Sequence, residues 1–139
     1  MRDRETEGVG SLHKHARYEY GAVAPAGAVL FTAGACPLDA DGNVVGLGDP
    51  VAQAAVALDN LIAALDGFGA RPENLVKTTV HVLGDRKDLV AVWNVVADGL
   101  APLRPPSTLL GVSALGYPGQ LVEIEGIAAL PDLERKRNQ

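Results

Sequence analysis

"GDPVAQAAVALDNLIAALDGFGARPENLVKTTVHVL", residues 48–83, decides the fold, because a helix pattern is followed directly by a strand pattern. Asp49 is a favourable N-cap residue, and Pro50 suits the first helical position, where a missing N–H leaves no hydrogen bond unmade. Apolar residues then recur at helical spacing as far as the glycines at 67–69, which predicts the end of the helix there. Segment 74–83 alternates between apolar and polar side chains, which is the pattern of a strand.

The chain on either side of this stretch adds four strands and one helix. Upstream, strands are predicted at 18–24 and 28–34, separated by a Pro-Ala-Gly turn. Downstream, Asp85 can cap a second helix, and two strands follow at 107–113 and 121–129. The order β-β-α-β-α-β-β predicts an α+β single domain, in which a mixed sheet carries both helices on one face.

The other sheet face would then combine charged and apolar side chains without a helix to cover it. It would hold Lys77, Thr79, His81, Leu83, Glu123, Glu125 and Ile127. A face of this mixed character is better covered by copies of the same chain than by water. We therefore expect a homo-oligomer with pockets where its subunits meet.

Composition limits the possible classes of function. The 139 residues, 47% hydrophobic and 21% charged, fit one globular domain. A net charge of −5 argues against binding nucleic acid through its phosphates. The longest apolar runs fall short of the ~20 residues that span a bilayer, so no membrane association is expected.

The ends of the chain and its one cysteine suggest a cytoplasmic protein. The charged start differs from a signal peptide, and Cys36 has no second cysteine for an internal disulfide. We expect a flexible arm over 1–16, the domain over 17–131 and a charged tail over 132–139.

We expect neither a cofactor nor a bound metal. The glycine motifs that cradle nucleotide phosphates are absent. His13 and His15 alternate and could chelate a metal with a third ligand, but no cysteine or carboxylate motif supports them.

Several segments in order resemble the YjgF/Rid (reactive intermediate deaminase) family, also filed as endoribonuclease L-PSP, over residues 18–130. They are "LFTAGACPLDADGNV" (30–44), "AQAAVALDNLIAAL" (52–65), "ENLVKTTVHVL" (73–83) and "VEIEGIAAL" (122–130). The resemblance implies a chorismate-mutase-like homotrimer, in which the sheets line a central β-barrel and a small-molecule cleft lies at each subunit interface.

The resemblance also implies an activity and a set of site residues. Active members hydrolyse enamines and imines such as 2-aminoacrylate to ketoacids and ammonia. In their Pro-Ala-Arg-Ser signature the arginine holds the substrate carboxylate, and a glutamate of the last strand is associated with the water. This chain reads Pro-Pro-Ser-Thr at 105–108, which places Ser107 on the arginine and Glu123 on the glutamate. Tyr20 and Asn94 align with a tyrosine and an asparagine of the family.

The missing arginine changes what the cleft should bind. A guanidinium grips a carboxylate through two charge-assisted hydrogen bonds, whereas a serine hydroxyl offers one neutral donor. We therefore expect Ser107 to favour a neutral or hydroxylated ligand. Arg104 could replace the missing cation only if its loop followed a different path before the two prolines.

The residues that remain leave alternatives open. Glu123 could act as a general base, or it could join Glu125 in ion pairs across a subunit interface. Gly34 would let the backbone approach a ligand or another strand closely, and Cys36 is either a reactive thiol or a small buried side chain. The sequence thus predicts either an imine or enamine deaminase (a hydrolase) of altered substrate range or a non-catalytic, metabolite-binding or regulatory trimer.

Overall fold

The computed structural model describes residues 5–6, 15, 17–24 and 26–130. Its elements in chain order are β1 (Glu5–Thr6), β2 (Ala22–Val23), β3 (Val29–Phe31), α1 (Pro50–Gly67), the 3₁₀ turn η1 (Pro72–Asn74), β4 (Leu75–Val82), α2 (Arg86–Leu100), β5 (Ser107–Gly111) and β6 (Val122–Ala129).

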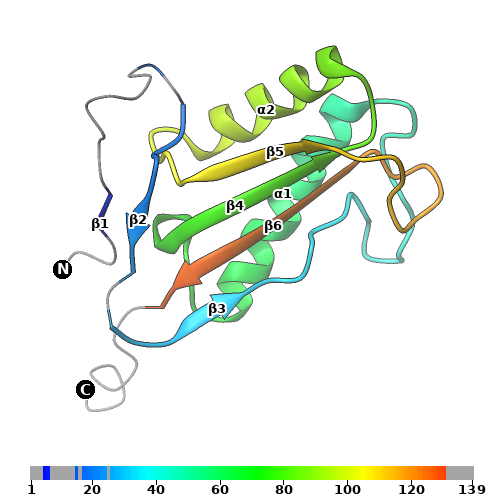
Figure 1. The fold of residues 1–139 in the computed structure, drawn as a ribbon. Coiled ribbons are helices and arrows are strands. Elements are labelled where there is room, and N and C mark those ends of the chain that lie inside the picture. Colours follow the sequence, from blue (N-terminus) through cyan, green and yellow to red (C-terminus); the bar gives the residue numbers. More distant parts are fainter. Residues whose placement is uncertain (1–4, 7–14, 16, 25, 131–139) are drawn as a thin grey trace.

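Four strands form the main sheet in the order β3-β6-β4-β5. The β4–β5 pair is parallel, and the other two pairs are antiparallel. Both helices lie on one side of this sheet, as Figure 1 shows, and α1 also packs along α2. The predicted α+β fold, with a mixed sheet and two helices on one face, is confirmed.

The two helices begin where the sequence predicts. The Asp49 carboxylate accepts a hydrogen bond from the Ala52 N–H at 3.1 Å, with Pro50 in the first helical position. Asp85 and Asp88 form a reciprocal capping box at the start of α2. Gly69, at a φ of +79°, turns the chain out of the last turn of α1.

The core lies between the helices and the sheet. Alternate residues of β4 and β6 are buried there, so the residues between them lie on the helix-free face. The largest buried core residues are Leu58, Leu61, Leu65, Leu75, Leu100 and Ile124.

The first predicted strand, 18–24, is shorter than predicted and lies outside the main sheet. Only Ala22–Val23 is a strand, and it pairs with Glu5–Thr6 in a separate two-stranded sheet. The preceding residues have other contacts: the Tyr18 ring packs edge-on against Trp93, and the Glu19 N–H donates to the Arg104 carbonyl. Ring packing against α2 therefore replaces strand pairing in this segment.

The second predicted strand, 28–34, is shorter than expected because its pairing with β6 is interrupted. Phe31 pairs with Ile127, and the next bridge joins Ala35 to Ile124. Residues 32–34 therefore lie opposite only 125–126. Segment 32–34 thus has one residue more than the segment opposite, which makes a bulge. Bulges redirect nearby side chains.

The last two strands begin at or next to their predicted starts, although β5 ends at Gly111 instead of 113. Apart from Glu5–Thr6 and His15, the predicted arm over 1–16 lies outside the described residues, as does the tail over 132–139. Neither α1 nor α2 has the length and apolar character to cross a membrane.

Candidate functional site

The carboxylate of Glu123, which the sequence predicts as a site residue, lies on the helix-free face of β6. Its Oε1 atom accepts hydrogen bonds from the Cys36 thiol at 3.3 Å and from the Gln120 amide at 3.2 Å. No group in the described part of the chain donates to Oε2. One carboxylate oxygen is thus held by two donors, and the other has no donor among the described residues.

Gly34 makes room for this carboxylate. A Cβ atom built on Gly34 would overlap the Glu123 side chain, with the carboxylate carbon only 2.5 Å away. The bridge between Ala35 and Ile124, with hydrogen bonds of 2.7 and 3.0 Å, holds the two segments side by side. The bulge and Gly34 together allow Glu123 to lie over the backbone of a neighbouring segment.

Cys36 belongs to this cluster, although the sequence left its role open. Burial, together with the hydrogen bond to Glu123 and the negative charge of Glu123, raises the pKa of the Cys36 thiol from 9.0 to about 11. The thiol is therefore protonated at neutral pH and acts as a donor to the carboxylate. Cys36 follows Gly34 by two residues, so the same-face alternation of extended chain could have indicated its position.

Two buried glutamines support the loop that leads into Glu123. Gln120 is 2% exposed, and its amide also donates to the Val122 carbonyl and accepts from the Tyr117 N–H. Gln53, fully buried on α1, donates to the Gly119 carbonyl at 2.9 Å and accepts from the Leu121 N–H at 2.7 Å. Sequence reasoning missed both residues. We call Gly34, Cys36, Gln120 and Glu123 the carboxylate corner.

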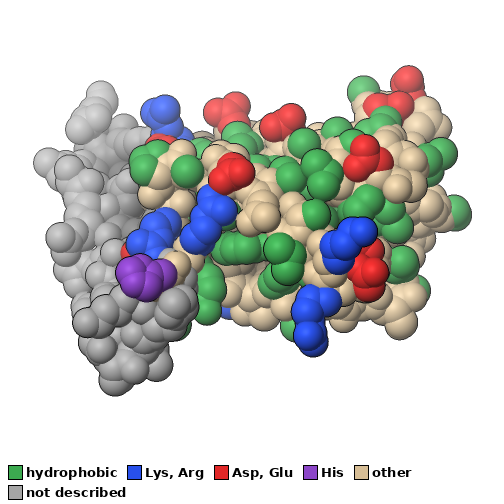
Figure 2. Space-filling view, turned by 90° about the horizontal axis from the view of Figure 1, so that it is seen from above, with side chains coloured by type: hydrophobic (Ala, Val, Ile, Leu, Met, Phe, Trp, Pro, Cys, Tyr) green, Lys and Arg blue, Asp and Glu red, His purple; other side chains and the backbone are tan. Residues whose placement is uncertain are grey.

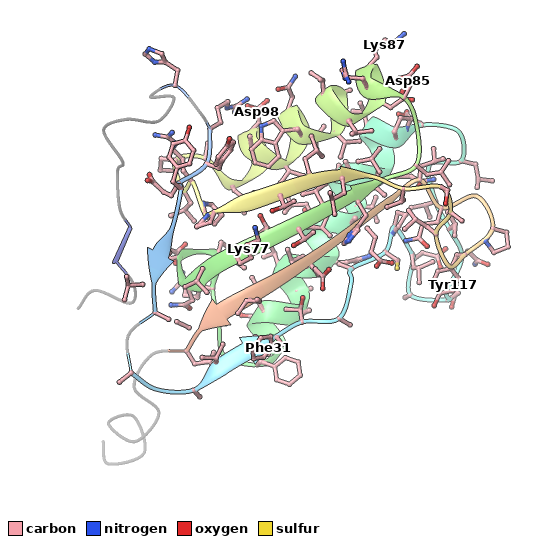
Figure 3. The ribbon with its side chains drawn as sticks, in the orientation of Figure 1. Phe31, Lys77, Asp85, Lys87, Asp98 and Tyr117 are labelled. Carbon is pink, nitrogen blue, oxygen red and sulfur yellow. The ribbon has the colours of Figure 1, made fainter. Side chains whose placement is uncertain are left out.

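A hollow of about 700 Å³ borders the carboxylate corner without including Glu123. Figure 3 shows Phe31 at the end of β3 and Tyr117 on the loop between β5 and β6, and both line this hollow. Asn60 on α1 donates to the carbonyls of Cys36 and Leu38 and so fixes the bulged segment against the helix.

Ser107 lies in a different place, at the start of β5. Its hydroxyl oxygen accepts a hydrogen bond of 2.8 Å from the buried Thr78 hydroxyl, which places the Ser107 side chain on the helix side of the sheet. A hollow of about 390 Å³ is lined there by Tyr18, Trp93, Ser107, Thr108 and Leu109, which we call the aromatic corner.

The other predicted site residues lie near the aromatic corner but outside its lining. The Tyr20 ring packs edge-on against Tyr18, with ring centroids 5.5 Å apart. Asn94 is exposed on α2, next to Trp93. The Arg104 side chain is exposed, and its backbone carbonyl holds the Glu19 N–H.

The two corners do not meet within one chain. Thr78 pairs with Ser107, whereas His81, three residues further along β4, pairs with Glu123 on the other flank of that strand. From the usual strand spacings, the Cα atoms of Ser107 and Glu123 lie on the order of 14 Å apart. The predicted site is therefore divided into a carboxylate corner and an aromatic corner.

The helix-free face between the corners carries paired polar groups. His81 Nε2 lies 3.6 Å from a Glu125 carboxylate oxygen, and His81 Nδ1 lies 3.4 Å from the Glu123 carbonyl. The Lys77 ammonium, labelled on β4 in Figure 3, donates to the Thr108 hydroxyl at 2.6 Å. Among the described residues, no three metal-ligating side chains gather into a cluster.

The mixed sheet with two helices on one face matches the fold of solved YjgF/Rid structures. The family model described as endoribonuclease L-PSP matches residues 11–130. The chain therefore belongs to the YjgF/Rid family, and the resemblance seen in the sequence is confirmed.

Curated relatives and solved structures agree with this assignment. A RutC family protein of Synechocystis is 35% identical over 113 residues, which cover 81% of this chain and 86% of that protein. A RutC family protein of Pyrococcus horikoshii is 32% identical over 109 residues, covering 78% and 85%. YyfB of Yersinia pestis, described as a Rid-family protein of unknown function, aligns over 92% of this chain and 99% of its own with a TM-score of 0.86 and 26% identity.

Proposed function

We propose that this chain is a homotrimeric Rid protein that hydrolyses imines or enamines in clefts between its subunits. The observation that carries the proposal is the Glu123 carboxylate, with Oε1 held by two donors and Oε2 open. A carboxylate fixed in this way can orient a water molecule and accept its proton, which typically contributes about 10²–10⁴-fold to a rate.

In this reaction the water oxygen adds to the carbon of the C=N bond, and one water proton passes by way of Glu123 to the nitrogen, which gives a carbinolamine. The hydroxyl proton of the carbinolamine then passes by way of the same carboxylate to the nitrogen, the C–N bond breaks, and ammonia leaves as the carbonyl group forms. Cys36 and Gln120 keep the carboxylate in position throughout, since both donate to the oxygen that does not take the proton.

Two features support the proposed trimer: the separation of the two corners within one chain and the mixed character of the helix-free face. If sheets of neighbouring copies pack through this face, the carboxylate corner of one subunit can face the aromatic corner of the next. The apolar Ile127 and the ion-paired His81 and Glu125 would then be shielded from water. Each cleft would need two chains to be complete.

The test compares the hydrolysis of 2-iminopropionate with that of its neutral amide, 2-iminopropionamide, each generated in place and followed by ammonia release. We expect the neutral imine to be the better substrate, because no charged residue lines the aromatic corner among the described residues. E123Q should lose at least about 100-fold in rate. E125Q serves as the matched control, since Glu125 pairs with His81 and does not contact Cys36.

Turnover of 2-iminopropionate at the rate of family members that carry the arginine would contradict this substrate preference. A non-catalytic metabolite-binding trimer is the second candidate, favoured by the same lack of a charged anchor beside Ser107. A metabolite that raises the melting temperature without being turned over would support that role instead.

The endoribonuclease name of the matching family does not lead us to propose RNA cleavage. Binding through phosphates requires clustered Lys and Arg side chains, and the chain carries a net charge of −5. On the face seen in Figure 2, the coloured basic side chains are interspersed with acidic and apolar ones.

A further inference from the structure

Two aromatic rings, those of Tyr18 and Trp93, line the aromatic corner at a steep angle to each other. The planes of Tyr18 and Trp93 lie at 71° to each other, with centroids 6.3 Å apart. A flat ring placed in such a corner can lie parallel to one wall and meet the other edge-on, and both arrangements are favourable for aromatic pairs. Leu109 adds an apolar surface. The volume of about 390 Å³ lies in the range of small-molecule sites, about 300–1,000 Å³.

The polar group of this corner is a donor. The hydroxyl oxygens of Thr78 and Ser107 lie 2.8 Å apart, and with Thr78 as the donor the proton of Ser107 is left to donate to a ligand. A ligand should therefore present an acceptor, such as a carbonyl oxygen or an imine nitrogen, at this position.

The edge of β5 supplies further polar groups. In the parallel pairing with β4, the Pro106 carbonyl accepts from the Thr78 N–H, so alternate residues of β5 turn their backbone groups toward β4. The backbone groups of Ser107 and Leu109 then face outward, at the open edge where the hollow lies. An amide-like ligand could pair with such an edge through both a donor and an acceptor.

The nearby cations have partners of their own and are not among the lining residues of the hollow. Lys77 donates to the hydroxyl of Thr108, which lines the hollow but pairs with Thr79, a residue of the helix-free face. Arg17 forms an ion pair with Asp98, and the exposed Arg104 is not a lining residue. An anionic ligand would therefore lose its hydration in this corner without gaining a charged partner.

The geometry points to a site at the aromatic corner for a neutral, planar ring that carries an amide-like or imine-like acceptor, in preference to a carboxylate. The inference deepens the proposed function, because it names the class of molecule that the cleft selects. Ser107 acts here as a specificity-determining donor, and Tyr18 and Trp93 hold the ring.

Binding at this site can be followed by tryptophan fluorescence, because Trp93 lines the hollow and is the single tryptophan of the chain. The full-length protein is titrated with benzamide and with benzoate, which share size and shape and differ in charge, and Trp93 emission is recorded. We expect benzamide to bind at least about tenfold more tightly than benzoate. S107A should weaken the binding of benzamide about 3- to 10-fold, because one hydrogen bond is lost.

Two further variants separate a specific site from general effects. S107R introduces a guanidinium and should reverse the preference toward benzoate, whereas S113R, an exposed serine beyond β5, should leave the preference unchanged. Y18L should weaken benzamide about tenfold by removing one ring wall, whereas Y117L, the same change at the other hollow, should not.

Equal affinity for the two probes, tighter binding of benzoate, or binding of neither by the wild-type protein would overturn the inference. R104A would show whether a benzoate preference came from that arginine. E123Q is included because it should retain benzamide affinity even where hydrolysis is lost. Wild-type protein that selects benzamide but hydrolyses neither imine refutes the proposed function alone, and wild-type protein that hydrolyses an imine without selecting benzamide refutes this site alone.

Discussion

The carboxylate corner and the aromatic corner are built in opposite ways. Around Glu123, two buried glutamines, a thiol and a glycine fix one polar group with little freedom. Around Ser107, ring surfaces and an open strand edge make a shallow hollow with a neutral donor. The comparison teaches that a site can separate chemistry from selection: the first corner orients a reacting group, and the second chooses the molecule that reaches it.

The largest effect is expected from removing the support beneath the carboxylate corner. Q53L removes the hydrogen bonds of the fully buried Gln53 to the Gly119 carbonyl and the Leu121 N–H. A hydrogen bond typically contributes about 0.5–1.5 kcal/mol, so the free energy of unfolding should fall by about 1–3 kcal/mol. Urea denaturation at one fixed protein concentration measures this free energy of unfolding. N94L is the matched control and should change stability by less than about 0.5 kcal/mol, because Asn94 is exposed.

The next effect concerns the thiol, which reports on Glu123 because Cys36 is the single cysteine. Alkylation by iodoacetamide should follow a pKa of about 11 in the wild type. The negative charge of Glu123 disfavours the thiolate, so E123Q should lower this pKa and accelerate alkylation at pH 8 several-fold. The rate is measured against pH, with E125Q as the control. An unchanged profile in E123Q would show that the thiol and the carboxylate are not in contact.

A smaller effect of the same kind is expected from G34A. The added Cβ would displace the Glu123 carboxylate, weaken its hydrogen bond to Cys36 and raise the alkylation rate by about two- to threefold. G116A is the control, because a Cβ at Gly116 would meet no atom within 4 Å. Equal rates in both variants and the wild type would mean that the Glu123 side chain does not lie over Gly34 in solution.

Local signals in the sequence predicted most of the fold. The Asp49 and Asp85 caps, the helical spacing and the alternation in 74–83 depend on neighbours a few residues apart, and the corresponding elements are present. The prediction was wrong at 18–24, where ring packing against Trp93, a contact between distant segments, replaces strand pairing.

The candidate site was only partly predictable, for the same reason. Glu123 was predicted through the family resemblance and Gly34 through the close approach that a glycine allows, and the structure shows them in contact. The hydrogen bonds from Gln53 to the 119–121 loop join residues more than 60 positions apart, and no periodicity in the sequence indicates them. Tyr20 was chosen from the sequence, whereas Tyr18, two residues earlier, lines the hollow.

The account depends most on the proposal that copies of this chain pack through the helix-free face and complete each cleft with two different subunits. Sedimentation equilibrium of the full-length protein at micromolar concentration tests it directly. We predict a particle with three times the 14.4 kDa mass of one chain. A stable monomer that still hydrolyses a neutral imine would contradict the account, because one chain alone keeps Glu123 and Ser107 apart.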